Sequence, residues 1–141
     1  MKTFLCSVIL VSFAKVTSAA TFSGTFWDAD VFFRTVDEAI AFAETNPSTA
    51  RFESSLIDYP RVGTINPART TSLTDLLGPD AGSLMGADAP RLDPSVFLWT
   101  GEIALAAGVH DFAVSSDDGF RLSIEGLAAF EWNNTRSFGT T

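Results

Sequence analysis

Apolar and polar positions alternate in short runs between residues 95 and 132, and glycine-containing turns separate several of the runs. The runs predict strands at 96–105, 109–115, 120–124 and 127–132. A strand buries one face when every second side chain is apolar, so this period predicts an antiparallel meander, with Glu125-Gly126 as a turn signal. Its buried face is expected to hold Phe112, Val114, Phe120, Leu122 and Ile124. Strands at this spacing are typical of a β-sandwich or barrel.

A helical period is clearest near the N-terminal side of the chain. Thr35-Val36-Asp37-Glu38 has the spacing of a capping box, and Asn46-Pro47 ends the segment. The apolar residues between these signals form a single stripe: Val36, Ala39, Ile40 and Ala43. The pattern predicts one short helix that covers one side of a sheet.

Two further strands are predicted on either side of this helix. Residues 22–27 form an aromatic-rich run, and residues 49–59 alternate until the pattern breaks at Leu56-Ile57. Residues 60–94 are rich in proline and glycine and predict loops, with one helical turn from Ser72 to Leu77 that ends at Gly78. The predicted fold is therefore mainly β, an antiparallel sandwich or barrel with one short N-terminal helix.

The first 20 residues have the pattern of a secretory signal peptide. Met1-Lys2 supplies a positive start, residues 4–14 are apolar, and Thr17-Ser18-Ala19-Ala20 offers small residues for cleavage. The alternative is a short N-terminal anchor, but the run is shorter than the roughly 20 residues that span a bilayer. The sequence predicts a signal peptide at 1–20, a single domain at 21–141, and a location outside the cell or in the cell envelope.

Acidic residues dominate the charge of the chain, with 17 acidic against nine basic residues. Removal of residues 1–20 takes away both lysines and the single cysteine, Cys6, and leaves seven arginines and a net charge of about −10. Such a surface repels phosphate backbones and anionic lipids, which argues against nucleic acid as a partner and against membrane insertion. It suits cations and neutral ligands such as sugars.

The candidate functional site is the acidic turn of Asp117, Asp118 and Gly119. Two adjacent carboxylates at the rim of a sheet are able to bind a hard cation such as calcium or to hydrogen-bond a sugar, and all three residues are candidate ligand-binding positions. Calcium takes six to eight oxygen ligands, so Asp117 and Asp118 would begin its coordination shell without completing it. The alternative is that both acids only cap a turn.

Two stretches around this turn resemble the protective-antigen domain family, a β-barrel shared by bacterial toxins, glycosidase inserts and fungal adhesins. They are WTGEIAL at 99–105 and AGVHDFAVSSDDGFRLSIEG at 107–126, within a core match of 96–132. The resemblance implies a lectin-like fold with further strands after the last residues of this chain, so we expect the last strands to be missing. In the sugar-binding fungal members a cis peptide joins the two aspartates, which share a calcium ion. Only Asp117 and Asp118 carry over to this chain.

No arrangement of residues in the sequence predicts catalysis. His110 and Asp111 are neighbours in a predicted strand and therefore point to opposite faces, and no nucleophile motif accompanies them. Of the tryptophans, Trp99 lies within a regular strand and is expected in the core. We expect a secreted, non-catalytic module for carbohydrate binding or adhesion, with a glycan or cell-surface polysaccharide as partner and calcium as possible cofactor. The alternative is a structural or protein-interaction domain that binds no ligand.

Overall fold

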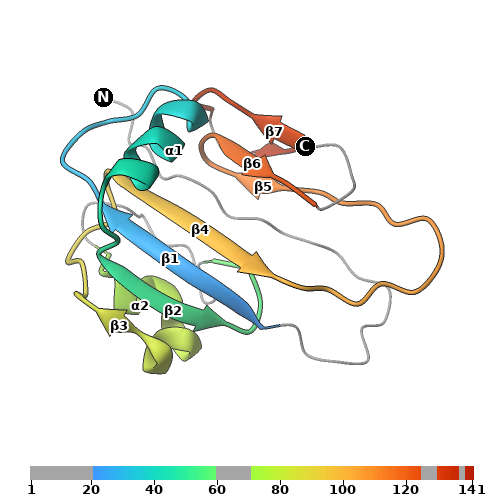
Figure 1. Ribbon diagram of the computed structural model, residues 1–141, viewed down its shortest axis with the longest axis horizontal. Helices are drawn as coiled ribbons and strands as arrows, with labels where there is room; N and C mark the ends of the chain where they lie inside the picture. The colour runs from blue at the N-terminus through green and yellow to red at the C-terminus, as the bar shows by residue number, and fades with distance from the viewer. Residues whose placement is uncertain (1–20, 60–70, 125–129, 137–138) are drawn as a thin grey trace.

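A four-stranded antiparallel sheet forms the centre of the structure, which is a computed structural model and describes residues 21–59, 71–124, 130–136 and 139–141 (Figure 1). The strand order is β3-β2-β1-β4, and two separate pairs, β5-β8 and β6-β7, accompany the sheet. The elements are β1 (Phe22–Asp28), α1 (Val36–Thr45), β2 (Ala50–Ser54), α2 (Leu73–Leu77), the 3-10 helix η1 (Gly78–Ser83), β3 (Met85–Gly86), β4 (Ser95–Gly101), β5 (Ser115–Ser116), β6 (Phe120–Leu122), β7 (Phe130–Trp132) and β8 (Gly139–Thr140).

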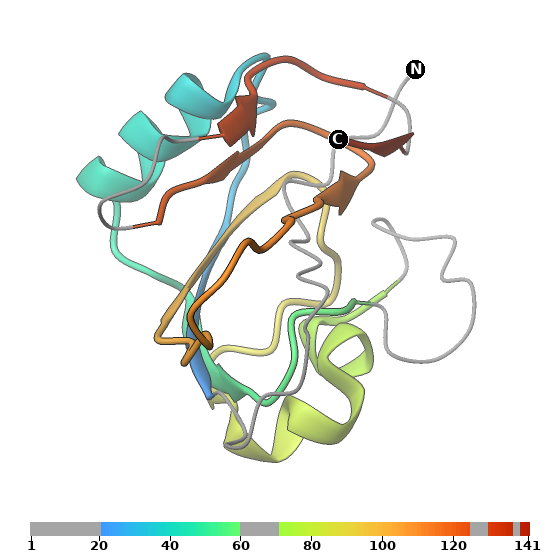
Figure 2. The same cartoon turned by 90° about the vertical axis from the view of Figure 1, so that its right-hand side faces the viewer.

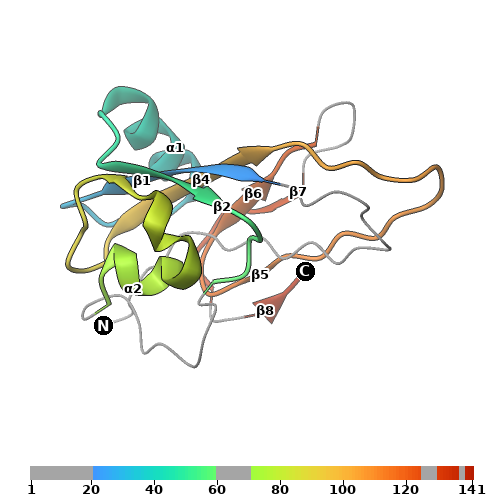
Figure 3. The ribbon, with the colours of Figure 1, turned by 90° about the horizontal axis from the view of Figure 1, so that it is seen from below.

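Strand β1 lies at the middle of this sheet because both of its edges are paired. Phe26 lies opposite Ala50 of β2 on one side and opposite Phe97 of β4 on the other. The two faces of the sheet are covered by different helices, α1 on one face and α2 on the other (Figure 3). Each face therefore has its own apolar cluster.

The larger cluster packs aromatic side chains of the sheet against α2. The rings of Phe97 and Trp99 stack at 5.2 Å, and Trp99 also stacks on Tyr59 at 5.9 Å. The prediction that Trp99 is a core residue is thus confirmed, since the residue is only 9% exposed. The smaller cluster, on the other face, consists of Trp27, Ala29, Phe33, Ala39 and Val96, with Phe42 and Ala43 packed against it.

The two predicted helical segments are confirmed. The Thr35 hydroxyl accepts a hydrogen bond from the Glu38 amide at 3.2 Å, and Asn46 is the C-cap of α1. Val36 and Ala39 are buried and lie toward the sheet. Likewise Ser72 caps α2, which ends at Gly78. Both helices formed as predicted because their start and stop signals are local in the sequence.

The predicted meander is wrong in most of its pairings, although the antiparallel β class is confirmed. Strand β4 ends at Gly101 and pairs with β1, and residues 102–114 contain no strand. β6 pairs with β7 as expected, while the Glu125-Gly126 turn lies outside the described residues. Of the five expected core residues, Val114 and Phe120 are fully buried; the other three, Phe112, Leu122 and Ile124, are only partly buried.

One boundary prediction also needs correction. The predicted strand 49–59 ends at Ser54. There the Ser54 hydroxyl donates a hydrogen bond to the main-chain carbonyl of Leu56 at 3.1 Å. The C-terminal residues form β8, whose partner is β5, and the backbones of Val114 and Thr141 exchange two hydrogen bonds. A closed sandwich or barrel is not formed by the strands that the structure describes.

Candidate functional site

The acidic turn connects β5 to β6 and places its two carboxylates in different environments. Asp117 is exposed, whereas only 4% of Asp118 is exposed. The buried Ser116 hydroxyl donates to the main-chain carbonyl of Asp118 at 2.7 Å, which fixes the turn from within. The two carboxylates therefore do not share one solvent-facing position.

Gly119 is the point of closest approach between this turn and its neighbours. A Cβ atom at this position would lie 2.7 Å from Cγ2 of Val36, 2.9 Å from the carbonyl oxygen of Trp132 and 3.2 Å from that of Asn134. Its φ is outside the left-handed region, so conformational freedom is not the reason for a glycine here. A side chain is excluded by space, which gives Gly119 a packing role.

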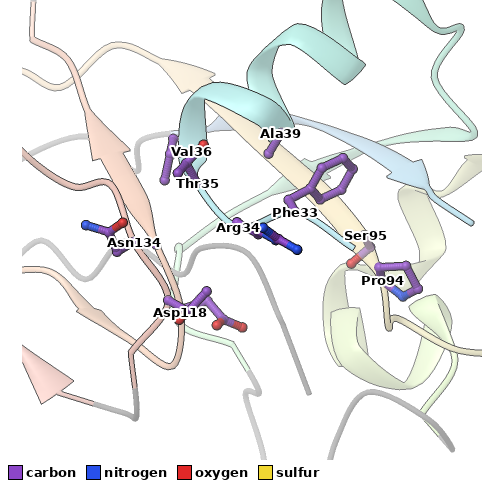
Figure 4. A pocket seen from close by; sticks show the side chains of 11 residues that line it. Phe33, Arg34, Thr35, Val36, Ala39, Pro94, Ser95, Asp118 and Asn134 are labelled. Carbon is purple, nitrogen blue, oxygen red and sulfur yellow. The ribbon is translucent and has the colours of Figure 1, made fainter. Parts of the chain in front are cut away.

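A small cavity opens beside Asp118, between the turn, the N-terminal end of α1 and the start of β4 (Figure 4). Its volume is about 20 Å³, enough for one water molecule. The Asp118 carboxylate points into the space that Arg34, Pro94 and Ser95 border, and Asn134 also lines the cavity. The cavity is therefore too small for a sugar ring, and a sugar would have to bind at the exposed rim of the turn.

A network of charged side chains lies next to the turn and was not predicted from the sequence. Arg121 of β6 bonds Asp37 of α1 at 2.7 Å and Glu131 of β7 at 2.6 Å. The hydrogen bond from Arg121, together with one from Asn133, holds the pKa of Asp37 below its usual value, and the two carboxylates raise the pKa of Arg121. All charges of this network are paired, so it acts as a clamp between elements.

Asn133 completes the clamp at the N-terminus of α1. Its main-chain carbonyl accepts from the amide of Val36 at 3.0 Å, and its side chain exchanges hydrogen bonds with Asp37. These bonds satisfy amides that the first turn of a helix leaves without partners. Figure 2 shows the result: β7 lies beside α1, and α2 lies at the opposite end of the molecule.

Three further features concern residues and motifs that the sequence singled out. The cis peptide bond among the described residues precedes Pro94, and none joins Asp117 to Asp118. In the same part of the chain, no three or more Asp, Glu, His or Cys side chains gather as metal ligands do. The ring of His110 donates to the carbonyl of Ala106 at 2.7 Å and lies in no strand.

One further aromatic residue lies close to the turn. Trp132 pairs with Phe120, which follows Gly119 directly, and Trp132 is 43% exposed. The guanidinium of Arg136 lies 5.3 Å from the centroids of both the Phe120 and Trp132 rings. The indole is therefore held in place and still open to solvent.

The predicted signal peptide lies outside the described residues, and within them no helix is both long and apolar enough to cross a membrane. Comparisons of the chain with protein-family models, with curated proteins and with solved structures gave no match.

Proposed function

We propose that this protein is a secreted, non-catalytic module that binds carbohydrate at the exposed side of its acidic turn. The observation that carries the proposal is that the exposed Asp117 lies in the turn that leads into β6, and that the exposed Trp132 of β7 pairs with Phe120 at the start of β6. Carboxylates accept hydrogen bonds from sugar hydroxyls, and indole rings pack on the apolar side of a pyranose. The resemblance of residues 99–126 to the protective-antigen domain family belongs to the same proposal.

Calcium is the proposed cofactor, with Asp117 as its exposed ligand and Asp118 as the buried residue behind it. Because the two carboxylates differ so much in exposure, the protein supplies few oxygens at the rim, and we expect a Kd of about 1 mM, at the weak end for extracellular sites. A sugar hydroxyl would then complete the coordination shell. This arrangement makes calcium binding and sugar binding mutually dependent.

The test is thermal unfolding with and without 10 mM calcium, using Asp117→Asn as the variant. At ten times its Kd, calcium stabilises the folded state by about 1.4 kcal/mol, and the variant should lose this stabilisation. Asp117→Asn should still fold, since Asn also caps turns. The matched control is Asp111→Asn, an exposed carboxylate on the preceding segment, which should keep the calcium response.

A panel of oligosaccharides then decides whether the site binds sugar. Binding should require calcium and should be lost in both Asp117→Asn and Trp132→Ala. If neither calcium nor any oligosaccharide binds, the proposal is wrong.

A second candidate function is a structural or protein-interaction domain whose acidic turn binds nothing. The observation in its favour is that two residues of the turn and its strand have folding roles, Gly119 in packing and Arg121 in the clamp. Under this reading, Asp117→Asn leaves every binding measurement unchanged. The same experiments therefore separate the two functions.

A further inference from the structure

A groove of about 480 Å³ runs between α1, β4 and β6. Its walls are mostly apolar and include Ile40 and Ala43 of α1, Val96 and Leu98 of β4, and Leu122 of β6. Leu98 is half-exposed at 50%, and none of the described helices and strands covers its side chain fully. The groove thus leaves an apolar surface open at the middle of β4.

Two open strand edges border the same groove. β4 is the last strand of its sheet and pairs only with β1, and β6 pairs only with β7, among the strands that the structure describes. Arg121 and Leu122 of β6, with Ser123 just after it, line the groove opposite residues 96–100 of β4, and Figure 1 shows β6 between β7 and β4. Open edges present main-chain N–H and C=O groups that pair readily with an added strand.

Charge around the groove limits what kind of strand fits. Glu44 lies on its wall, and Glu102 is exposed just beyond β4. The cation on the wall, Arg121, is already bonded to Asp37 and Glu131. A second copy of this acidic chain would add negative charge to a negative surface, whereas a basic segment would complement it.

We propose that this groove binds an extended, basic segment of another protein, which adds a strand to the open edge of β4. Every second side chain of this segment is apolar and contacts Leu98 and the face of α1 that lines the groove. Its lysines or arginines lie near Glu44 and Glu102. A segment of seven residues in β conformation, about 23 Å long, matches the seven residues of β4. This binding mode is independent of the acidic turn and of calcium.

The experiment uses a synthetic eight-residue peptide of alternating lysine and valine, and two control peptides. One control has glutamate in place of lysine, and the other has proline at two central valines and so lacks the amides that a ladder needs. Binding is measured by titration, and the site by hydrogen–deuterium exchange. The basic peptide should bind and slow exchange about tenfold at residues 96–101 and 120–122, and neither control peptide should do so.

Variants of the protein test the groove itself. Leu98→Lys should weaken binding about tenfold or more, and Met85→Lys should not, because Met85 is also exposed to solvent but lies on β3 at the opposite edge. Glu44→Gln, an exposed position on the groove wall, should weaken binding of the peptide and reduce the dependence of binding on salt. This variant leaves β4 itself unchanged.

Four results would overturn the proposal. The first is that the basic peptide does not bind, and the second is that it binds without slowing hydrogen exchange in β4. The third is that the acidic peptide binds equally well. The fourth is that hydrogen exchange in β4 slows as protein concentration rises in the absence of peptide, which would mean that a second copy occupies the groove.

Discussion

The space around Gly119 leaves no room for a methyl group, because two of the three closest atoms are main-chain oxygens of residues 132 and 134. A flexible side chain is able to move aside, but main-chain oxygens in a bonded segment are not. We therefore expect Gly119→Ala to destabilise the protein by about 1–3 kcal/mol, as other overpacked sites do. Urea denaturation measures the effect.

The control for this variant is Gly82→Ala in η1, where a Cβ would meet nothing within 4 Å. This change should be neutral or slightly stabilising, since alanine restricts the unfolded chain. Equal losses of stability in Gly119→Ala and Gly82→Ala would contradict the packing role of Gly119.

Burial separates two residues that the sequence placed together in one predicted core. Phe120 is fully buried and Leu122 only partly. Phe120→Ala should cost about 3–5 kcal/mol. Leu122→Ala should cost about 1 kcal/mol, because only part of its side chain leaves water on folding. Similar losses of stability in the two variants would mean that Leu122 is buried as fully as Phe120.

At the scale of elements, the clamp between α1 and the β6–β7 pair makes the stability of the fold depend on pH. The pKa of Asp37 is lowered in the folded state, first by its hydrogen bond with Arg121. A lowered pKa means that the stabilisation is complete above the ordinary value of 3.8 and is lost as pH falls through the folded-state pKa. Acid should therefore loosen α1.

The measurement is urea denaturation from pH 7 to pH 2 for the natural protein and for Asp37→Asn. The natural protein should be more stable above pH 4, and the difference should shrink toward zero as pH falls further. The control is Asp30→Asn, an exposed carboxylate outside this clamp. A difference that stays constant down to pH 2 would contradict the assignment.

The elements also show how much of the fold the sequence could predict. Both helices were predicted because their caps lie within a few residues of the segments that they start and end. The pairing of β4 with β1 was not predicted, because β1 lies about 70 residues earlier and nothing in the sequence of either strand specifies the other. Residues 102–113 alternate in part as a strand does but pair with no strand among the described residues, and alternation alone does not form a strand.

The candidate site was predicted to a similar extent. The motif around Asp117 and Asp118 identified a turn, and the structure places it between β5 and β6. The different exposure of the two acids could not be predicted, because it depends on α1 and β4 packing against the turn. The clamp through Arg121 was missed for the same reason: its partner Asp37 lies 84 residues away.

For the whole molecule, the excess of acidic residues predicts a response to salt. The chain carries a formal net charge of −8, and its repulsion acts mainly on the compact folded state. Raising sodium chloride from 10 to 150 mM shortens the screening length from about 30 to about 8 Å and should increase the urea midpoint. A decrease would show that the exposed ion pairs of the clamp outweigh the repulsion.

The bond between Asn133 and the first turn of α1 also orders events during synthesis. Asp37 and Asn133 are separated by 96 residues. At about 5–20 residues per second, a ribosome needs roughly 5–20 s after making Asp37 before Asn133 exists. Throughout that interval the helix lacks its clamp, and β1 lacks β4 for most of it. The contacts of α1 therefore cannot be complete until Asn133 has been made.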